Sequence, residues 1–430
     1  MDGQENINGQ APGTDRSTIE SYLSLSEYRK GSFEFKAMPI PNDALMYSDA
    51  FCLQEGVISN MSSPLSPLAS EIMSPLSIDA MLDTRPKEQA SSEQLEAKQE
   101  HVPRMFKLSS VLIHLALFGI FGVLLRYGLQ VVFGPDVAGF TDDHSPLFYS
   151  DFPANILGSF LMGWFGFVFK PTILEFSEEL ALGLTTGFLG SLTTFSSWIQ
   201  KMLTLTTQGR WVFGLLGLPI GLWITIGAIR SGIETGKKLR QFMDHEGHYE
   251  TSCFDGKCRV KSCRDKMVSF GIVLVMLALV LGLSIFLTCQ RSKKLGLACL
   301  FGPLGVWTRW FLTRFNGRGF GSNQRLMWIP WGTLLANVLA SGIMASLSTL
   351  NIAEKTEHYQ TVIEAIQLGF LGCMSTVSTF VAEVYSLAEN GHVWRAFWYS
   401  ILSIGLSFAL GTLVYSVPVW TKCYSFTDGR

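Results

Sequence analysis

The chain has 430 residues and a formal net charge of −2, and only 16% of its residues are charged, whereas 48% are aliphatic, aromatic or Cys. A mean hydropathy of +0.27 and long apolar runs after Leu108 are typical of a membrane protein and argue against a soluble domain. The near-neutral charge without basic tracts argues against nucleic-acid binding. The GxSxG, HExxH, Walker A and Rossmann motifs of common enzyme classes do not occur.

The first segment, residues 1–104, is predicted to be a disordered polar tail. It is rich in Ser, Pro, Glu and Gln, and Ser-Pro pairs at Ser63, Ser66 and Ser74 are typical of a phosphorylatable segment. The chain does not open with an apolar signal sequence, so the first transmembrane helix is expected to target the protein to the membrane.

Nine apolar runs are each long enough to cross a bilayer, for which about 20 residues are needed. Gly, Ser and Thr are frequent in these runs, as in helices that pack closely in lipid. The predicted fold class is therefore an all-α polytopic membrane protein. The nine runs cover residues 109–133, 152–170, 181–203, 211–231, 267–289, 295–315, 329–350, 362–387 and 394–418.

Basic residues in the loops favour a cytoplasmic N-terminus. About 16 Lys and Arg residues flank the spans on the N-terminal side of the membrane and about 8 flank them on the other side. Much of this excess lies in residues 233–266, which are predicted to form a basic cytoplasmic loop. Its cysteines match neither a zinc pattern nor a disulfide framework. Residues 421–430 are predicted to be a short C-terminal tail.

An internal repeat relates the two ends of the apolar region. Three motifs recur in the same order, at offsets of 183, 182 and 182 residues. The pairs are GIFGVLLRYGL (119–129) with GPLGVWTRWFL (302–312), FPANILGSFLMG (152–163) with LLANVLASGIMA (334–345), and GLTTGFLGSLTTFSSW (183–198) with AIQLGFLGCMSTVSTF (365–380).

The repeat predicts two four-helix domains, 105–232 and 291–420, joined by one linker transmembrane helix, 267–290. Because four crossings return the chain to the side on which it started, the one additional crossing inverts the second domain. Inverted repeats place a binding path near the midplane of the membrane, where equivalent helices meet about a pseudo-twofold axis.

Two pairs of polar residues occupy equivalent positions inside the predicted helices. Arg126 and Arg309 are either ligands for an anion or cations that tie helices together or reach the interface, because charge inside a membrane is expensive. Asn155 and Asn337 are either links between helices or amide donors directed at an anion.

The third helix of each domain is predicted to be broken near its middle. Glycine and hydroxyl residues cluster at 190–194, ending with Thr194, and at 372–376, ending with Thr376. Broken helices are tolerated in membranes only where protein or a cavity satisfies the backbone. Two breaks that meet on a pseudo-twofold axis would direct carbonyl oxygens at one point, which suits a hard cation.

The last helix carries a hydroxyl stripe. Tyr399, Ser403 and Ser407 recur every four residues and so share one helical face. Such hydroxyls are suited to donate hydrogen bonds to an anion that loses its water. The equivalent positions of the first domain hold Gly217, Gly221 and Thr225, so most of the stripe is absent there.

These motifs resemble the CrcB/Fluc fluoride channels and, in the two-halves-plus-linker arrangement, the eukaryotic fluoride exporters of the FEX type. The resemblance covers about residues 109–418 and is carried most specifically by the string at 187–196. It implies that phenylalanines of the broken helices line narrow fluoride paths. By motif these positions hold Phe195 and Trp198 in the first domain, and Val377 and Phe380 in the second.

Further site residues are implied by the same resemblance. The asparagine of the family pore corresponds to Asn155 and Asn337, and an acidic residue after the motif corresponds to Glu383, where the first domain has Lys201. A structural sodium ion would be held by backbone carbonyl groups. The residues implied for that ion are Gly190, Thr193, Gly372 and Ser375.

The function expected from this resemblance is passive, fluoride-selective export through one working pore. The residues expected to line the fluoride path are Phe195, Phe380, Asn155, Asn337, Thr194, Thr376 and the hydroxyl stripe of Tyr399, Ser403 and Ser407. A negative cell interior drives an anion outward by about 2.3 kcal/mol per 100 mV, so ATP is not needed. The chain is expected to act as a monomer in the lipid bilayer of the plasma membrane. Two alternatives are a proton-coupled anion transporter, which is also built from inverted repeats, and a membrane scaffold that acts through its polar tail.

Overall fold

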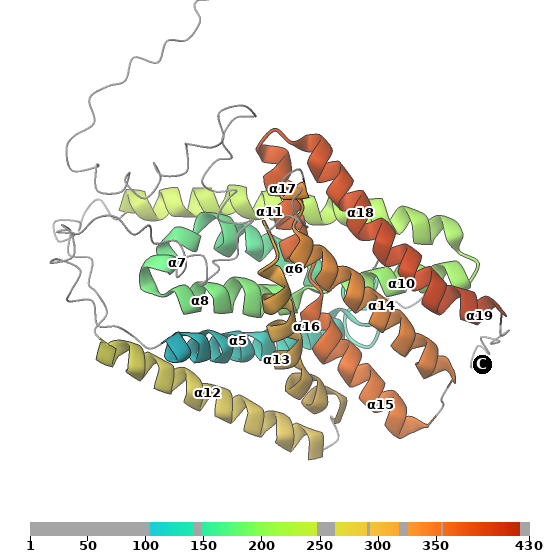
Figure 1. The fold of residues 1–430 in the computed structure, drawn as a ribbon, viewed down its shortest axis with the longest axis horizontal. Coiled ribbons are helices and arrows are strands. Elements are labelled where there is room, and N and C mark those ends of the chain that lie inside the picture. The colour runs from blue at the N-terminus through green and yellow to red at the C-terminus, as the bar shows by residue number, and fades with distance from the viewer. Residues whose placement is uncertain are drawn as a thin grey trace, which may run out of the picture. The chain divides into compact units, whose positions relative to one another are not determined.

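The structure is a computed structural model that describes residues 104–141, 148–246, 263–289, 293–317, 326–353 and 356–421. These residues belong to one unit of the chain. Regular secondary structure within these ranges is helical throughout (Figure 1). The predicted N-terminal tail before Arg104, the cysteine-bearing part of the basic loop before Cys263 and the C-terminal tail lie outside the described residues.

The first half contains four consecutive helical segments, and the second and third of these are divided into shorter helices. The helix α6 has Pro153 in its first turn, where the missing N–H group of proline costs no hydrogen bond. The helix α8 is capped by Ser177, whose hydroxyl accepts a hydrogen bond from Leu180 N (3.2 Å). The elements are α5 (Arg104–Phe133), α6 (Phe152–Met162), η3 (Gly163–Val168), α7 (Lys170–Phe176), α8 (Glu178–Leu182), η4 (Gly183–Leu189), α9 (Gly190–Leu192), α10 (Phe195–Thr207) and α11 (Trp211–Glu246).

The linker helix has no counterpart in the first half, and the second half repeats the order of the first. The π-helical segments η4 and η7 occupy equivalent places, directly before the third helix is broken in each half. The elements are α12 (Cys263–Cys289), α13 (Lys293–Thr313), α14 (Trp331–Ala353), α15 (Glu357–Ile366), η7 (Gln367–Leu371), α16 (Gly372–Met374), α17 (Ser378–Glu389), α18 (Val393–Gly411), η8 (Thr412–Ser416) and α19 (Val417–Thr421).

The apolar helices agree with a polytopic membrane protein. In the described residues, seven helices are long and apolar enough to cross a membrane, and an eighth span arises if the pair 152–168 and 170–176, bent by 67°, is one span. The third span of the first half is divided into the short pieces from α8 to α10 and does not meet this test as one helix. The count of nine therefore stays a prediction. The helix α11 also continues to Glu246, beyond the predicted span 211–231.

The predicted inversion is confirmed by contacts along α5. Phe106 and Phe270, near the starts of α5 and α12, have ring centroids 4.8 Å apart, so these two helices begin on the same side. The next helix, α13, runs back along α5: Trp307 Nε1 donates to Leu112 O (2.9 Å), whereas Gly302 lies against Val123. The first helices of the two halves are therefore antiparallel.

Two faces of the helical unit can be defined from this chain path. We call the near face the one at which α5 and α12 begin, and the far face the one at which α5 ends. The helix α11 begins and α19 ends on the far face, and Trp211 and Trp420 stack there with centroids 5.1 Å apart. Tryptophan at such positions is typical of a membrane interface.

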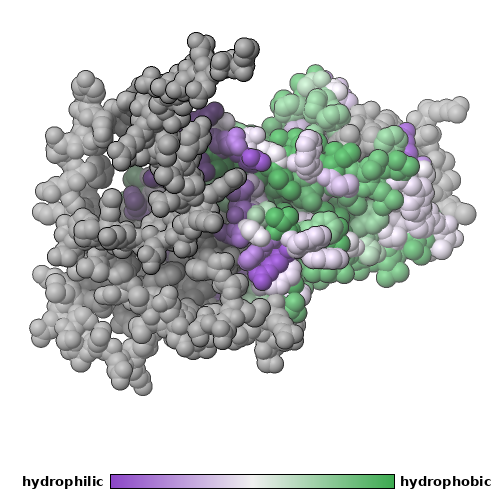
Figure 2. Space-filling model, turned by 90° about the horizontal axis from the view of Figure 1, so that it is seen from above, coloured by the Kyte–Doolittle hydropathy of each residue, from purple (hydrophilic) through white to green (hydrophobic). Residues whose placement is uncertain are grey.

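The surface of the helical unit suits contact with lipid. The linker helix α12 packs mainly on α5 and α13, and its remaining sides expose apolar residues such as Ile272 and Leu279. Apolar residues cover most of the surface that Figure 2 shows in colour, and hydrophilic residues gather toward one end. An apolar belt of this kind is expected of a protein that spans a bilayer.

Candidate ion path and the crossed helix breaks

The predicted helix breaks are confirmed in both halves. Thr193 and Thr194 have extended backbone between α9 and α10, and Ser375 has extended backbone between α16 and α17. The short helices α9 and α16 contact each other, so the two breaks lie together at the centre of the molecule. All residues of both breaks are buried.

Hydroxyl groups join the two breaks reciprocally. The Ser375 hydroxyl accepts from the backbone N–H groups of Phe195 and Ser196, at 3.1 Å each. The Thr193 hydroxyl accepts from those of Val377 (3.2 Å) and Ser378 (3.1 Å). Such an exchange between equivalent residues is what a pseudo-twofold axis requires. Each half therefore caps the first turn of the other half's broken helix.

The two predicted pore threonines lie in this same cluster. Thr194 Oγ1 is 3.2 Å from Ser375 Oγ, and Thr376 Oγ1 is 3.2 Å from Thr193 Oγ1. Both side chains are fully buried. Their hydroxyl groups are therefore parts of the junction between the halves.

Each asparagine holds the break of its own half. Asn155 Nδ2 donates to Thr194 O (3.1 Å), and its Oδ1 accepts from Thr194 N (2.8 Å). Asn337 makes the same two bonds with Thr376, at 3.1 and 2.9 Å. These bonds replace the helical partners that the break removes, so both asparagines act as structural links.

The two asparagines differ in their second amide hydrogen. Asn155 Nδ2 also donates to the Tyr149 hydroxyl (2.7 Å), and burial raises the pKa of Tyr149, so the phenol is neutral. In the part of the chain that the structure describes, Asn337 Nδ2 donates to Thr376 O alone. Asn337 therefore keeps one buried N–H group that is available to another acceptor, and Asn155 does not.

The breaks release carbonyl oxygens at the centre. In an unbroken helix the carbonyl of Gly190 would accept from Thr194 N, but Thr194 N donates to Asn155 instead. In the same way Thr376 N donates to Asn337 and leaves the carbonyl of Gly372 without its helical donor. Carbonyl oxygens without helical donors fit the predicted sodium ligand set, because hard cations take oxygen ligands.

The repeated arginines cross from one half to the other. The Arg126 guanidinium donates to Leu368 O and lies against Gly372, and that of Arg309 donates to Thr186 O and lies against Gly190. A Cβ atom at either glycine would collide with the guanidinium group, so any larger residue would have to displace the arginine. Of the two sequence interpretations, these contacts favour arginines that tie helices together.

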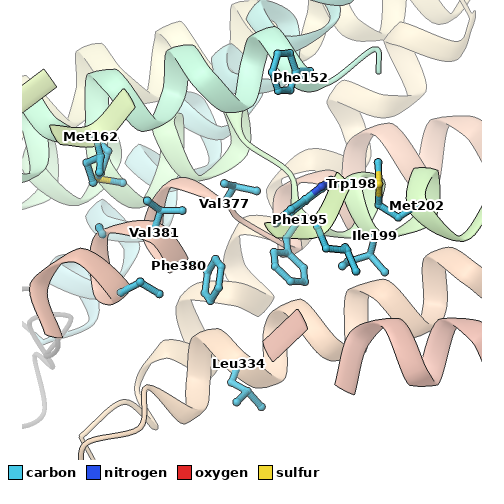
Figure 3. Close-up of a cluster of buried hydrophobic side chains, with 14 of the residues drawn as sticks. Phe152, Met162, Phe195, Trp198, Ile199, Met202, Leu334, Val377, Phe380 and Val381 are labelled. Atoms are coloured by element: carbon cyan, nitrogen blue, oxygen red, sulfur yellow. The ribbon is translucent and has the colours of Figure 1, made fainter. Parts of the chain in front are cut away.

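Aromatic rings and hydroxyl groups form a continuous row in the second half. Phe195 and Phe380, from opposite halves, meet edge to face with centroids 5.4 Å apart, as Figure 3 shows. The Phe380 ring lies 5.4 Å from that of Tyr399, which begins the stripe on α18. The hydroxyl groups of Ser403 and Ser407 on the same stripe are buried without a hydrogen-bond partner among the described residues.

Glu383 closes the near-face end of this row. Its carboxylate accepts hydrogen bonds from Tyr399 Oη (2.6 Å), Thr333 Oγ1 (2.6 Å) and Asn316 Nδ2 (3.3 Å). Its side chain is fully buried. The sequence identifies Glu383 and Tyr399, but the donors Thr333 and Asn316 come from other elements and carry no motif.

The equivalent row in the first half is filled by an indole. Trp198 stands where the second half has Phe380, and Gly221 stands where it has Ser403. A Cβ atom at Gly221 would lie 2.8 Å from Trp198 Cζ2, so the indole occupies the space that a Ser403-like side chain would need. The Thr225 hydroxyl donates to Gly221 O (2.9 Å) and is therefore engaged. The first-half row thus lacks free hydroxyl groups at these positions.

Comparisons with known proteins agree with the repeat and with this site. The model of the family described as CrcB-like protein, Camphor Resistance (CrcB), matches residues 113–233 and again 296–415, which together are more than half of the chain. The chain belongs to the CrcB family. The two matches fall on the two halves described above and leave α12 between them.

Relatives include both long and short members of this family. Fluoride export protein 1 of Neurospora crassa is 23% identical over 382 residues, which are 76% of this chain and 70% of that protein. Fluoride export protein 1 of Schizosaccharomyces pombe is 25% identical over 322 residues, 73% of this chain and 97% of that protein. The fluoride-specific ion channel FluC of Acidithiobacillus ferrooxidans is 36% identical over 124 residues, 27% of this chain and 89% of that protein. No solved structure matches the chain.

Proposed function

We propose that this protein is a passive, fluoride-selective channel that exports fluoride through one path, which runs along the α18 stripe. The observation that carries the proposal is the pair of buried hydroxyl groups of Ser403 and Ser407, which have no protein partner within the described residues. A buried hydroxyl group without a hydrogen-bond partner lowers the stability of the folded protein. Two such groups on the α18 face that carries Tyr399 therefore indicate a ligand that accepts their hydrogen bonds. The ion is inferred from relatives that are named fluoride export protein and fluoride-specific ion channel.

The aromatic residues of this path suit an anion. Ring edges carry the positive end of the aromatic quadrupole. Phe195 and Phe380 meet with an interplanar angle of 75°, so the edges of the two rings point in different directions. The free N–H of Asn337 and the hydroxyl groups of Ser403 and Ser407 replace the water that fluoride loses. A narrow path with strong donors favours the small fluoride ion over chloride.

Export follows from the membrane potential. Fluoride that enters a cell as HF dissociates at cytoplasmic pH, and a negative interior drives the anion outward by about 2.3 kcal/mol per 100 mV. We propose the plasma membrane as the site of action, with the near face cytoplasmic. Because both halves of the junction are supplied by one chain, we also propose that a monomer is sufficient.

A sodium ion is proposed as a structural component at the crossed breaks. The carbonyl groups of Gly190, Thr193, Gly372 and Ser375 would hold it, because hydrogen bonds to Asn155 and Asn337 leave carbonyl oxygens of both breaks without helical donors. When bound, the ion neutralises the negative ends of these carbonyl dipoles. The residues of the chain itself still form the junction through the hydroxyl exchange.

A proton-coupled anion transporter is the alternative. A relay requires acidic groups along the path, and the described path contains Glu383, whose carboxylate already accepts three hydrogen bonds. This arrangement favours a passive channel.

Fluoride efflux from liposomes that contain the purified full chain tests the proposal, with a potassium gradient and valinomycin setting the potential. We expect fast efflux that follows the voltage, with little chloride movement. Efflux that follows a proton gradient at zero potential would instead establish the coupled transporter. Folded protein without fluoride flux would refute both transport functions.

A further inference from the structure

A further buried hydroxyl group without a partner lies on the helix that carries the stripe. Ser416 belongs to η8, the π-helical turn that continues α18, and its side chain is fully buried. Its hydroxyl group has no hydrogen-bond partner among the described residues, and the same holds for Ser403 and Ser407. A buried hydroxyl group without a partner lowers the stability of the folded protein, so Ser416 calls for an explanation as the two stripe serines do.

A regular α-helix would not bring Ser416 to the side of the stripe. Ser416 follows Ser407 by nine residues, and at 3.6 residues per turn these nine residues rotate by about 900°. The two side chains would then point to opposite sides of the helix. The π-helical turn, Thr412–Ser416, holds one residue more than an α-helical turn. This additional residue rotates Ser416 back by about 100°, toward the side of the stripe.

The first half shows the arrangement that results without a π-helical turn. There the residue equivalent to Ser407 is Thr225, which is buried, and the residue equivalent to Ser416 is Glu234. The helix α11 is α-helical from Trp211 to Glu246, and the Glu234 side chain is exposed, as the count of nine residues requires. The π-helical turn therefore accounts for the burial of Ser416, and such turns are frequent at functional sites.

The turn η8 lies between the same helices as the stripe. Both α18 and η8 pack against α10 and α14, and Thr349 of α14 donates its hydroxyl hydrogen to Val414 O (3.1 Å). The helix rises by about 12 Å from Tyr399 to Ser407 and by about 25 Å from Tyr399 to Ser416. The hydrocarbon core of a bilayer is about 30 Å thick. Ser416 therefore lies where an ion that follows the stripe approaches the far face.

An apolar contact separates Ser416 from the stripe. Gly411 lies between Ser407 and Ser416 in the sequence, and Leu203 of α10 packs directly against it, so a side chain at position 411 would have to displace Leu203. The Leu203 side chain is fully buried. An ion that leaves Ser407 must therefore pass an apolar side chain, and a hydrogen-bond donor beyond that side chain lowers the cost of the step.

We infer that the Ser416 hydroxyl group is a further fluoride-binding group, which donates a hydrogen bond to the ion on the far-face side of the contact between Leu203 and Gly411. The inference rests on the proposed channel function and adds a binding position beyond the stripe. Ser407 and Ser416 bind the ion on either side of the contact. The ion thus exchanges one hydroxyl donor for another as it passes Leu203, and loss of the Ser416 hydroxyl group raises the barrier to this step.

Fluoride efflux from liposomes that contain the full chain tests the inference, with thermal unfolding measured on the same preparation. We expect Ser416→Ala to slow efflux about tenfold or more, because a hydrogen bond to a charged acceptor is lost. The unfolding temperature should equal or exceed that of the wild type, because the lost hydroxyl group has no partner among the described residues. Ser416→Cys keeps a similar volume and a weak S–H donor, so its efflux should be intermediate.

Thr412→Val is the matched control. It removes a hydroxyl group from the same π-helical turn, but the Thr412 hydroxyl group already donates to Phe408 O (2.8 Å) and is not available to an ion. Efflux should therefore be unchanged in Thr412→Val.

Three results would contradict the inference. Wild-type efflux in Ser416→Ala, together with slower efflux in Ser403→Ala, would show that the path follows the stripe but does not use Ser416. Equal losses of efflux in Ser416→Ala and Thr412→Val would show that efflux responds to any change in η8. A lower unfolding temperature of Ser416→Ala would show that its hydroxyl group supports the fold. Wild-type protein that conducts no fluoride would instead refute the proposed function itself.

Discussion

Removing the hydroxyl groups of the α18 stripe should lower fluoride flux and raise stability at the same time. Ser403 and Ser407 are fully buried, and their hydroxyl groups have no partner among the described residues. A hydrogen bond to a charged acceptor contributes about 1.5–3 kcal/mol. Ser403→Ala or Ser407→Ala should therefore slow fluoride efflux by about 10- to 150-fold if the barrier rises by that amount.

The effect on folding has the opposite sign. A buried hydroxyl without a partner costs the folded state about 1–3 kcal/mol, so each alanine variant should unfold at the same or a higher temperature than the wild type. Efflux measured with a fluoride electrode and unfolding followed in detergent would give both quantities on one preparation. A parallel loss of flux and of stability would refute the reasoning, because it would mean that these hydroxyl groups hold the fold together.

Ser159 offers a matched control for this experiment. Its hydroxyl on α6 is also buried and without a partner in the described residues, but it does not lie on α18. Ser159→Ala should remove the same group with a similar effect on stability, that is, an unfolding temperature equal to or above that of the wild type, and leave efflux unchanged. Equal losses of flux in Ser159→Ala and Ser403→Ala would contradict the assignment of the path to the α18 stripe.

Three further predictions concern the path, the breaks and the ion. Phe380→Leu should reduce efflux more than tenfold, because a ring edge is lost. Its loss of stability should be smaller than the value of about 3–5 kcal/mol for a Phe→Ala change. Efflux and thermal unfolding are measured on one preparation, and unchanged efflux would contradict the role of the Phe380 ring in the path. Asn155→Ala should destabilise the fold by about 2–5 kcal/mol, seen as a lower unfolding temperature, because it leaves Thr194 N–H and C=O unpaired. Replacing sodium by N-methylglucamine should lower the unfolding temperature by several degrees, and equal values in both salts would argue against the ion.

The internal repeat made much of this fold predictable from the sequence. Three motif pairs at nearly one offset, together with an odd number of spans between the halves, are sufficient to predict inversion, and the contacts between α5 and α13 follow that prediction. Glycine and hydroxyl residues also located both helix breaks correctly at Thr193–Thr194 and Ser375–Thr376. These features depend on local composition and on counting, which a sequence contains.

Contacts between distant segments were not predictable in the same way. The position of Trp198 over Gly221 depends on how α10 packs on α11. The sequence around either residue does not indicate that the two are in contact. The donors Asn316 and Thr333 reach Glu383 over 67 and 50 residues of sequence. Hydrogen bonds of this kind follow from the folded geometry, whereas hydropathy and motif patterns register only neighbours along the chain.

The fusion of both halves in one chain explains why one row of residues could be lost. In a symmetric dimer of one half, a Phe→Trp change would occur in both rows. A tryptophan at the position of Phe380 would place an indole beside Tyr399, because the ring centroids of Phe380 and Tyr399 are 5.4 Å apart. In this chain Trp198 fills the first row against Gly221 without changing the second. The two residues are complementary in size, because a side chain at 221 would collide with the indole. A large residue and the missing side chain opposite it therefore form one packed unit between α10 and α11, which also contacts Phe195, whose ring lies 5.5 Å from that of Trp198.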